Sequence, residues 1–348
     1  LIGLVGSEMC IRDRSRADHF ANYAEAVAAP SDYTMSEESM STLYNDHNWT
    51  PEDFNDPNDE MPVTGANNGL KLADLRGADY DDERWDTLLD QLTYSEMVQT
   101  ITLGFHNTAA AASIGKTATK DENGPQGLTA ALTGGASAMC YTSEDVMAAT
   151  FNVDLINEVG RCIGEDCLAM GYSGLYGPGI NMHRTAYCGR NFEYYSEDPF
   201  VAGTICAAEV QGIQSKGVYV YLKHVALNDS ETSRRGVNTW LNEQTAREIY
   251  LEVADKAITD GGAWSVMTGF NRWGATWCGA NANLLTGYLR GELGMRGMCI
   301  TDFSGSSQYM DLVDGLIAGF DIWDSPMPKI HTTKACLLYT SPSPRDRS

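Results

Sequence analysis

Positive charge is scarce in this sequence, and several motifs that indicate a particular chemistry are absent. The chain has 24 Lys and Arg against 47 Asp and Glu, a formal net charge of −23 at pH 7. Such a surface repels nucleic acid and anionic membranes, so we expect neither nucleic acid nor a membrane as a partner. It favours a neutral substrate. HExxH, GxxxxGK(S/T) and GxSxG are missing, as are His and Cys at metal-ligand spacing, so no metal and no cofactor are predicted.

Paired cysteines are also absent. Of the nine cysteines, seven lie away from the chain ends, an odd number without any CxxC pair. This pattern indicates reduced and mostly buried thiols, and we therefore expect a cytoplasmic location. The seven are Cys140, Cys162, Cys167, Cys188, Cys206, Cys278 and Cys299.

The two ends of the chain differ from the rest and are related to each other. LVGSEMCIRDR begins at Leu4, and CLLYTSPSPRD begins at Cys336. In permissible codons one segment is the reverse complement of the other in a different frame, a relation that ordinary protein sequence lacks. The pair resembles a translated sequencing adapter. We expect residues 1–14 and 336–348 to be non-native and exclude them from fold reasoning.

Between these ends the sequence predicts an irregular leader and one large domain. Residues 15–70 form an acidic segment, rich in Pro and Asn and without sustained periodicity, as in NDHNWTPEDFNDPNDEMP. With 43% hydrophobic and 20% charged residues, the chain has an ordinary globular composition. We expect the folded domain over residues 71–335.

A repeating rhythm of helix and short apolar strand runs through this domain. Continuous apolar strands indicate a parallel sheet covered by helices, which fits either a (β/α)8 barrel or a doubly wound sheet. The predicted helices span residues 154–170, 199–215, 243–259, 283–292 and 307–317, and the predicted strands span 174–176, 218–222, 264–268, 298–301 and 320–323.

Polar residues at the strand ends favour the barrel. Strand after strand runs into polar groups, as in GPGINMHR, LKHVALND, MTGFN, CITDF and FDIWD. In a barrel these groups converge on the carboxyl-terminal rim, where active sites are built. The predicted fold is therefore α/β, a TIM-like (β/α)8 barrel that is incomplete at its C-terminal end.

The side chains brought to this rim suit a sugar. They include a carboxylate, Asp302, and the hydrogen-bond donors Arg190, Lys223 and His224, among many aromatic rings. Donors can orient sugar hydroxyls, rings can cover the apolar face of the sugar, and a carboxylate can attack an anomeric carbon.

Four longer motifs resemble glycoside hydrolase family 3, the β-glucosidase-like enzymes. They are YGPGINMHRTAYCGRNFEYYSEDPFVAG, LKHVALNDSETSRR, WSVMTGFN and LRGELGMRGMCITDF. The likeness runs from about Leu72 to Pro326. It implies a retaining, exo-acting β-glycosidase that hydrolyses terminal non-reducing β-linked sugars of small neutral glycosides through a covalent glycosyl-aspartate intermediate.

The resemblance also implies roles for individual residues. Asp302 matches the catalytic nucleophile, and Arg190, Lys223 and His224 match the residues that hold the hydroxyls of the sugar being cleaved. Met267 matches a position that lines the pocket.

The chain departs from the family pattern at three positions. Asn123 stands where relatives usually have the Asp of a DGP motif that grips a sugar hydroxyl, and Asp121 is a candidate substitute for that contact. Phe270 replaces a Tyr that many relatives have. Phe303 replaces the commoner Trp after the nucleophile and still supplies an aromatic wall.

The resemblance further implies that a second α/β domain of the same protein supplies the general acid/base, and we assign none within this chain. The chain by itself is therefore predicted to be weakly active or inactive. Two alternatives are a β-N-acetylhexosaminidase of the same family, disfavoured because KHVALNDSE replaces a KHFPGHG-type loop, and a catalytically impaired carbohydrate-binding barrel, suggested by Asn123 and Phe270.

Overall fold

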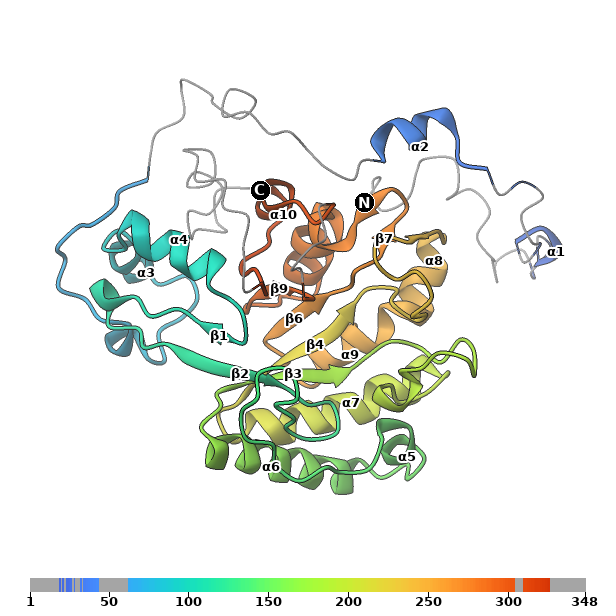
Figure 1. Ribbon diagram of the computed structural model, residues 1–348, viewed down its shortest axis with the longest axis horizontal. Coiled ribbons are helices and arrows are strands. Elements are labelled where there is room, and N and C mark those ends of the chain that lie inside the picture. The colour runs from blue at the N-terminus through green and yellow to red at the C-terminus, as the bar shows by residue number, and fades with distance from the viewer. Residues whose placement is uncertain are drawn as a thin grey trace.

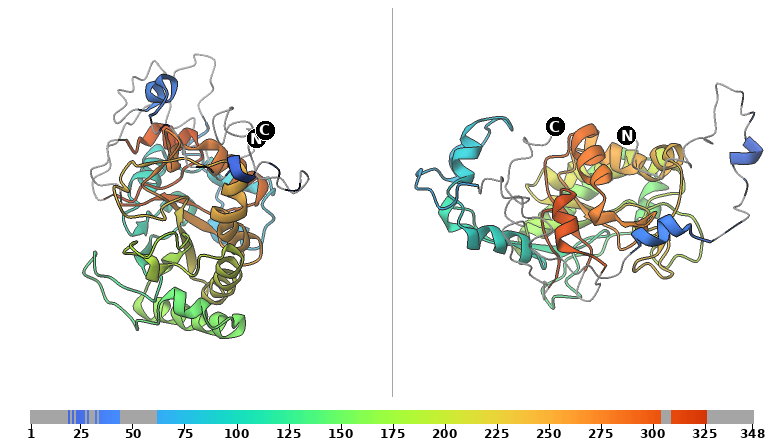
Figure 2. Two further views of the ribbon diagram at one scale, coloured as in Figure 1. Left: turned by 90° about the vertical axis from the view of Figure 1, so that its right-hand side faces the viewer. Right: turned by 90° about the horizontal axis from the view of Figure 1, so that it is seen from above.

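The computed structural model describes residues 62–303 and 309–325, with short stretches between residues 19 and 43. The predicted non-native ends lie outside the described residues. Within the predicted leader two short helices are described, and Figure 2 shows the first of them standing apart from the main body. These helices are α1 (Tyr23–Ala26) and α2 (Glu37–Thr42).

A curled six-stranded sheet forms the centre of the molecule (Figure 1). All neighbouring strands are parallel except the first pair, which is antiparallel. In pairing order the strands are β1 (Asn107–Thr108), β2 (Thr119–Asn123), β3 (Gly174–Gly179), β4 (Tyr219–Val225), β6 (Ser265–Thr268) and β9 (Cys299–Thr301).

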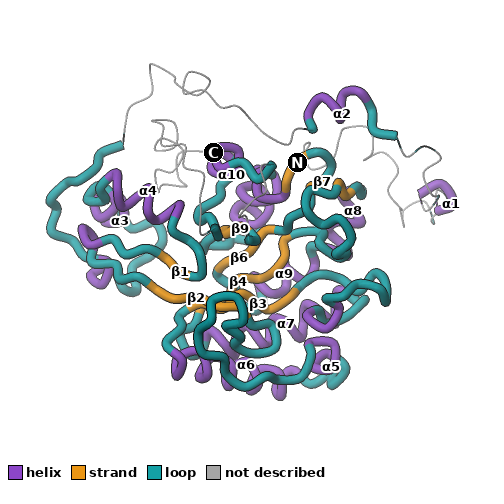
Figure 3. Tube along the Cα trace, viewed as in Figure 1, coloured by secondary structure: helices purple, strands orange, loops and turns teal. Residues whose placement is uncertain are grey.

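Helices cover the outer face of this sheet, as Figure 3 shows by its colours. The principal helices after β2 are α5 (Glu144–Ala148), α6 (Val153–Met170), α7 (Pro199–Gln214), α8 (Glu243–Thr245), α9 (Glu252–Thr259), a π-type helix (Asn283–Glu292) and α10 (Leu312–Ile317). Before the sheet lie α3 (Arg84–Leu89) and α4 (Tyr94–Thr102).

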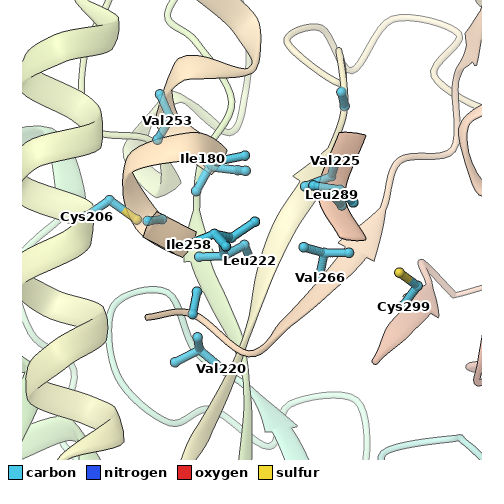
Figure 4. Packing of buried hydrophobic residues seen from close by; sticks show 14 of the residues in the cluster. Ile180, Cys206, Val220, Leu222, Val225, Val253, Ile258, Val266, Leu289 and Cys299 are labelled. Atoms are coloured by element: carbon cyan, nitrogen blue, oxygen red, sulfur yellow. The ribbon is translucent and has the colours of Figure 1, made fainter. Parts of the chain in front are cut away.

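Alternate residues of a strand face the two sides of the curled sheet, as strand geometry requires. Val220 and Leu222 of β4 belong to the large core beneath the helices, and Figure 4 shows Leu222 beside Ile258 of α9. Tyr221, between them, belongs to a separate interior cluster. That cluster consists of Tyr176, Tyr221, Met267, Ile300 and Ile322, one residue from each of five neighbouring segments.

The predicted α/β, TIM-like barrel is confirmed, and among the described residues its sheet has six strands rather than eight. The predicted last strand is reduced to one parallel bridge between Ile300 and Ile322. The next residue, Trp323, donates its backbone N–H to the carbonyl of Ile101, 2.8 Å away, close to the start of β1. The sheet thus curls far enough for the segment beyond β9 to meet the chain near β1.

Several element boundaries differ from the sequence prediction. β1 and β2 were not predicted, because TKDEN in β2 is polar. The predicted helix 243–259 is interrupted by a π-type turn at Ala246–Tyr250. The predicted helix 307–317 is observed in its later part, as α10 (Leu312–Ile317). A second, three-stranded sheet, also not predicted, consists of β5 (Asn238–Thr239), β7 (Arg272–Trp273) and β8 (Thr276–Trp277).

Local sequence signals set the helix ends. α4 begins with a capping box: Glu96 N donates to Thr93 Oγ1 at 3.2 Å, and Thr93 N donates to Glu96 Oε2 at 2.9 Å. α7 begins with Asp198 as its cap and Pro199 in its first turn. α6 ends at Gly171, whose φ of 81° is a left-handed conformation that glycine adopts without strain.

Glycines allow α6 and α7 to approach closely. A Cβ atom on Gly160 of α6 would collide with the carbonyl oxygen of Glu209, and one on Gly212 of α7 would collide with the carbonyl oxygen of Asn157. Both obstacles are helix backbone, which cannot move aside as the end of a flexible side chain can.

We therefore expect Gly160→Ala to lower the free energy of unfolding by about 1–3 kcal/mol, the usual effect of overpacking. Gly287→Ala is the matched control, because Gly287 is exposed in a helix and a Cβ there meets nothing closer than 3.9 Å. Urea unfolding of both variants measures the difference. Equal stability of the two would contradict the close packing of α6 on α7.

Candidate active site

Asp302 stands directly after β9, at the carboxyl edge of the sheet. Its Oδ2 lies 3.3 Å from Nε2 of His224 and 3.7 Å from Nη1 of Arg234. The backbone N–H of Phe303 donates to Oδ1 at 2.8 Å. The side chain is 13% exposed. The carboxylate is therefore held in place on one side and still reachable from outside.

β4 places both Lys223 and His224 in this site. Neighbouring residues of a regular strand face opposite sides. The pairing of β4 with β6 shifts register between Lys223 and Val225, so the strand is irregular where these two residues lie. Lys223 Nζ consequently reaches 3.6 Å from Glu193 Oε2, while His224 faces Asp302.

Arg190 is fixed by a two-pronged pair with Glu193. Its Nε donates to Oε1 at 3.1 Å and its Nη2 donates to Oε2 at 2.7 Å. Burial alone would raise the pKa of Glu193, but Lys223 and Arg190 outweigh it and hold that pKa below its usual range. Glu193 is thus an ionised group that holds two cations in place. The sequence motif contains Glu193 but did not by itself establish this role.

His224 is uncharged in this site. Burial, reinforced by the positive charges of Arg190 and Lys223, places its pKa well below the ordinary value. Asn181 orients the residue: its Oδ1 accepts the backbone N–H of His224 at 2.9 Å and lies 3.3 Å from Nδ1, and its Nδ2 donates to the carbonyl of His224 at 3.0 Å. His224 therefore acts as a neutral hydrogen-bonding group beside Asp302.

Arg234 was not predicted as a site residue, although it lies in the motif LKHVALNDSETSRR. Its guanidinium stacks over the Phe270 ring, 4.7 Å from the centroid, and reaches Asp302. Burial raises the pKa of Asp302, while Arg234 and Arg190 act in the opposite direction. The RR pair in the sequence was the available signal, but no spacing rule tells which Arg faces a carboxylate.

The other predicted site residues occupy different surroundings. Met267 of β6 is buried in the interior cluster of the barrel. Phe303 is 37% exposed beside Asp302, and its ring lies edge-on to that of Phe105 at 5.9 Å. Asn123 ends β2 with a half-buried side chain whose Nδ2 lies 3.4 Å from Glu122 Oε1.

Asp121 is not brought to this site. It pairs with Gly174, the first residue of β3, and so lies at the amino end of the strands. Its buried carboxylate accepts hydrogen bonds from the hydroxyls of Tyr219 at 2.5 Å and Tyr221 at 3.1 Å. Asp121 thus satisfies the interior tyrosines, and the suggestion that it substitutes for a sugar contact finds no support in its position.

Comparison with known proteins identifies the family to which a chain with this site belongs. Residues 105–323 match the family model described as the glycosyl hydrolase family 3 N terminal domain. The chain belongs to glycosyl hydrolase family 3. Within the described residues, no group of three or more His, Cys, Asp or Glu side chains could hold a metal ion.

Relatives within the family agree with this assignment. Thermostable beta-glucosidase B of Acetivibrio thermocellus is 34% identical over 253 residues, covering 70% of this chain and 33% of that protein. An exo-alpha-(1->6)-L-arabinopyranosidase of Bifidobacterium longum is 34% identical over 190 residues, covering 52% of this chain and 25% of that protein. The chain spans about a third of the length of the first of these relatives and a quarter of the second.

A solved structure supports the fold of this family 3 chain. Beta-glucosidase 3B of Thermotoga neapolitana, in complex with glucose, aligns with a TM-score of 0.64 and 33% sequence identity. The alignment covers 69% of this chain and 36% of the other.

The contact between Arg234 and Asp302 should lower the pKa of Asp302, and a substitution can test this. Arg234→Met removes a cation that favours the ionised carboxylate, so the pKa of Asp302 should rise by about one unit or more. Protonation of Asp302 should then begin at a higher pH as the solution is acidified. Carboxyl ¹³C NMR, with Asp302→Asn to assign the signal, measures the shift.

Arg235→Met is the matched control for that measurement. Arg235 stacks on the same Phe270 ring, 5.4 Å from its centroid. If the two variants shift the pKa of Asp302 equally, general loss of positive charge rather than the Arg234 contact is responsible.

Proposed function

We propose that this chain is the nucleophile-bearing barrel of a retaining, exo-acting β-glycosidase of the β-glucosidase type. The observation that carries the proposal is Asp302, held at the carboxyl edge of the sheet by Arg234 and His224 in a partly open position. Cationic and neutral donors surround the carboxylate, whereas metal-ligand clusters are absent from the described residues.

The reaction follows from this arrangement. Asp302 attacks the anomeric carbon of the terminal sugar, the bond to the aglycone oxygen breaks as the general acid gives that oxygen a proton, and a covalent glycosyl-aspartate forms. Water then attacks the anomeric carbon and loses a proton to the same group acting as a base, which breaks the bond to Asp302 and restores the carboxylate with net retention of configuration. Lys223 and Arg190 donate hydrogen bonds to sugar hydroxyls, and neutral His224 can donate or accept one.

The substrate we propose is a small neutral glycoside with a terminal β-linked sugar. The acidic composition, the printed names of the β-glucosidase relatives and the glucose complex of a structural neighbour support this choice. A relative named as an arabinopyranosidase shares 34% identity with the chain, so the barrel motifs alone do not select the sugar.

We propose that the general acid/base comes from a second domain outside the barrel. The support is the length of the relatives, of which this chain spans about a third. The hexosaminidase alternative has less support, because its family loop supplies a His where this chain has KHVALNDSE.

We also propose a reducing, cytoplasmic setting. The support is that the seven cysteines in the described part of the chain are all free, five of them buried. Over the same residues, no helix has both the length and the apolar character needed to cross a bilayer.

Asp302→Ala tests the nucleophile. In the protein that also contains the acid/base, turnover should fall by several orders of magnitude, because the carboxylate that attacks the anomeric carbon is removed. Azide should restore part of the activity and give a glycosyl azide of inverted configuration, detectable by NMR. Near-normal turnover, or no rescue product, would remove Asp302 from this role. Sugar binding without any turnover in the wild-type protein would favour the carbohydrate-binding alternative.

The 348-residue chain itself tests the origin of the general acid. General acid catalysis contributes roughly 10²–10⁴-fold, and a dinitrophenolate leaving group does not need it. The chain should therefore release dinitrophenol from an aryl β-glucoside much faster than it cleaves cellobiose. Hydrolysis of cellobiose at ordinary enzymatic rates by this chain would show that a general acid lies within it.

A further inference from the structure

Two glutamates lie in the core outside the site described above. Glu144 begins α5 and Glu209 lies within α7, and both are 0% exposed. Their helices bury apolar neighbours on either side, among them Met147, Cys206 and Val210. Glutamate is almost never fully buried without a partner, so two together require an explanation.

Each carboxyl group has one satisfied and one unsatisfied oxygen. Glu144 Oε1 accepts the backbone N–H of Gly179 at 3.1 Å, and Glu209 Oε2 accepts the hydroxyl of Tyr195 at 2.6 Å. Glu144 Oε2 and Glu209 Oε1 are buried and have no hydrogen-bond partner among the described residues. No ion pair with Lys or Arg is formed by either group in that part of the chain.

The two carboxyl groups lie on helices that pack against each other, α5 and α7. Two neighbouring carboxylates in an apolar core cannot both stay ionised, because desolvation and mutual repulsion add, and one proton between the two unpaired oxygens would relieve both. Burial and then the charge of Glu209 raise the pKa of Glu144 well above its ordinary value, and burial raises the pKa of Glu209 to about 7. Because the two groups are coupled, these shifts belong to the pair.

We propose that Glu144 and Glu209 share one proton between Glu144 Oε2 and Glu209 Oε1, and that this pair positions the end of β3 against Lys223. The connection is short. Gly179, which donates to Glu144, pairs with Lys223 in the sheet, and the N–H of Ile180 donates to the carbonyl of Lys223 at 2.6 Å. Glu144 and Glu209 are therefore positioning residues for the sugar-binding end of β4.

Other titratable groups near the pair do not account for this proton. Tyr195 and Cys206 have pKa values raised far above their ordinary values by burial and by Glu209. Glu193 has a pKa below its usual range, and burial lowers that of Lys223. Lys223 is thus the neighbour whose titration must be separated from that of the pair.

The shared proton gives stability a definite pH dependence. The folded protein binds this proton more tightly than the unfolded chain, whose glutamates have ordinary pKa values. The contribution is therefore fully present below the unfolded pKa, near 4.3, and is lost as the pH rises through the raised folded pKa. The loss follows because the deprotonated pair places a second negative charge in the core.

Glu209→Gln isolates the pair. The amide oxygen can still accept the Tyr195 hydroxyl, and the amide N–H can donate permanently to Glu144, so the variant mimics the protonated pair at every pH. Wild type should lose several degrees of melting temperature between pH 6 and pH 9 beyond any loss in Glu209→Gln. Glu158→Gln, at a side chain that is 65% exposed, is the control and should follow wild type.

Infrared spectroscopy observes the proton itself. Burial also raises the pKa values of Asp229 and Asp324 to about 7, so the spectrum of Glu209→Gln is subtracted from that of wild type. A protonated-carboxyl C=O band of wild type should remain in this difference at pH 6 and disappear by pH 9. If Glu209→Gln does not fold, Glu144→Gln supplies the same comparison. The sharing is overturned if the difference lacks the band, or if the variant keeps the pH dependence of wild type.

The positioning role rests on the proposed function and is measured with glucose by calorimetry. Between pH 6 and pH 9, wild type should lose about tenfold more affinity than Glu209→Gln, equivalent to one pKa unit of coupling. Lys223 titrates in both proteins, so its contribution to the loss of affinity cancels in the comparison. Equal losses would overturn the positioning role alone. If wild type does not bind glucose, the positioning role and the proposed function both fail, while the melting and infrared results still decide the shared proton.

Discussion

The site depends on one largely buried carboxylate, that of Glu193, which lies between two cations. Arg190 comes from the loop after β3 and Lys223 from β4. Without Glu193, Lys223 would lose this ion pair in a desolvated pocket, and Arg190 would keep only the more distant Glu231, at 3.6 Å. Removing one partner of such a buried group leaves an uncompensated charge, which is strongly destabilising. The two ends of β3 and β4 are consequently locked in one relative position, and a sugar would meet donors that are already oriented.

That cluster of positive charge also fixes the protonation of its neighbours. His224 stays neutral because burial and the adjacent cations disfavour a further proton. Asp302 responds in the opposite way, since the same cations favour its ionised form against the effect of burial. The ionised carboxylate is the form that can attack a sugar, so these cations oppose the effect of burial in the direction that the reaction needs.

The barrel supplies the rigid support for this arrangement. Alternate residues of the strands separate into an outer core under the helices and an inner cluster of large side chains. Asp121 belongs to the inner layer, where it accepts hydrogen bonds from two tyrosines at the end opposite Asp302. A carboxylate two residues from a motif position can thus serve packing rather than binding.

The sequence by itself determined the features that depend on local pattern. Apolar runs predicted β3, β4, β6 and β9, helical periodicity predicted α6 and α7, and polar strand ends identified Asp302, Lys223 and His224 as neighbours at one rim. The predicted element boundaries were wrong where the local sequence pattern was weak. The polar strand TKDEN pairs with β3 and β5 pairs with β7, segments that are distant in the sequence and that short-range patterns do not encode. β7 and β8 form a local hairpin, but two residues per strand are too few to show a pattern.

Only the tertiary structure decided which charges meet. Arg234 rather than Arg235 reaches Asp302, Asp121 turns away from the site, and Glu144 interacts electrostatically with a glutamate sixty-five positions along the chain. Each outcome depends on the register between strands and on the close approach of helices. Those distances arise from packing over the whole barrel, so residue types and spacing alone could not fix them.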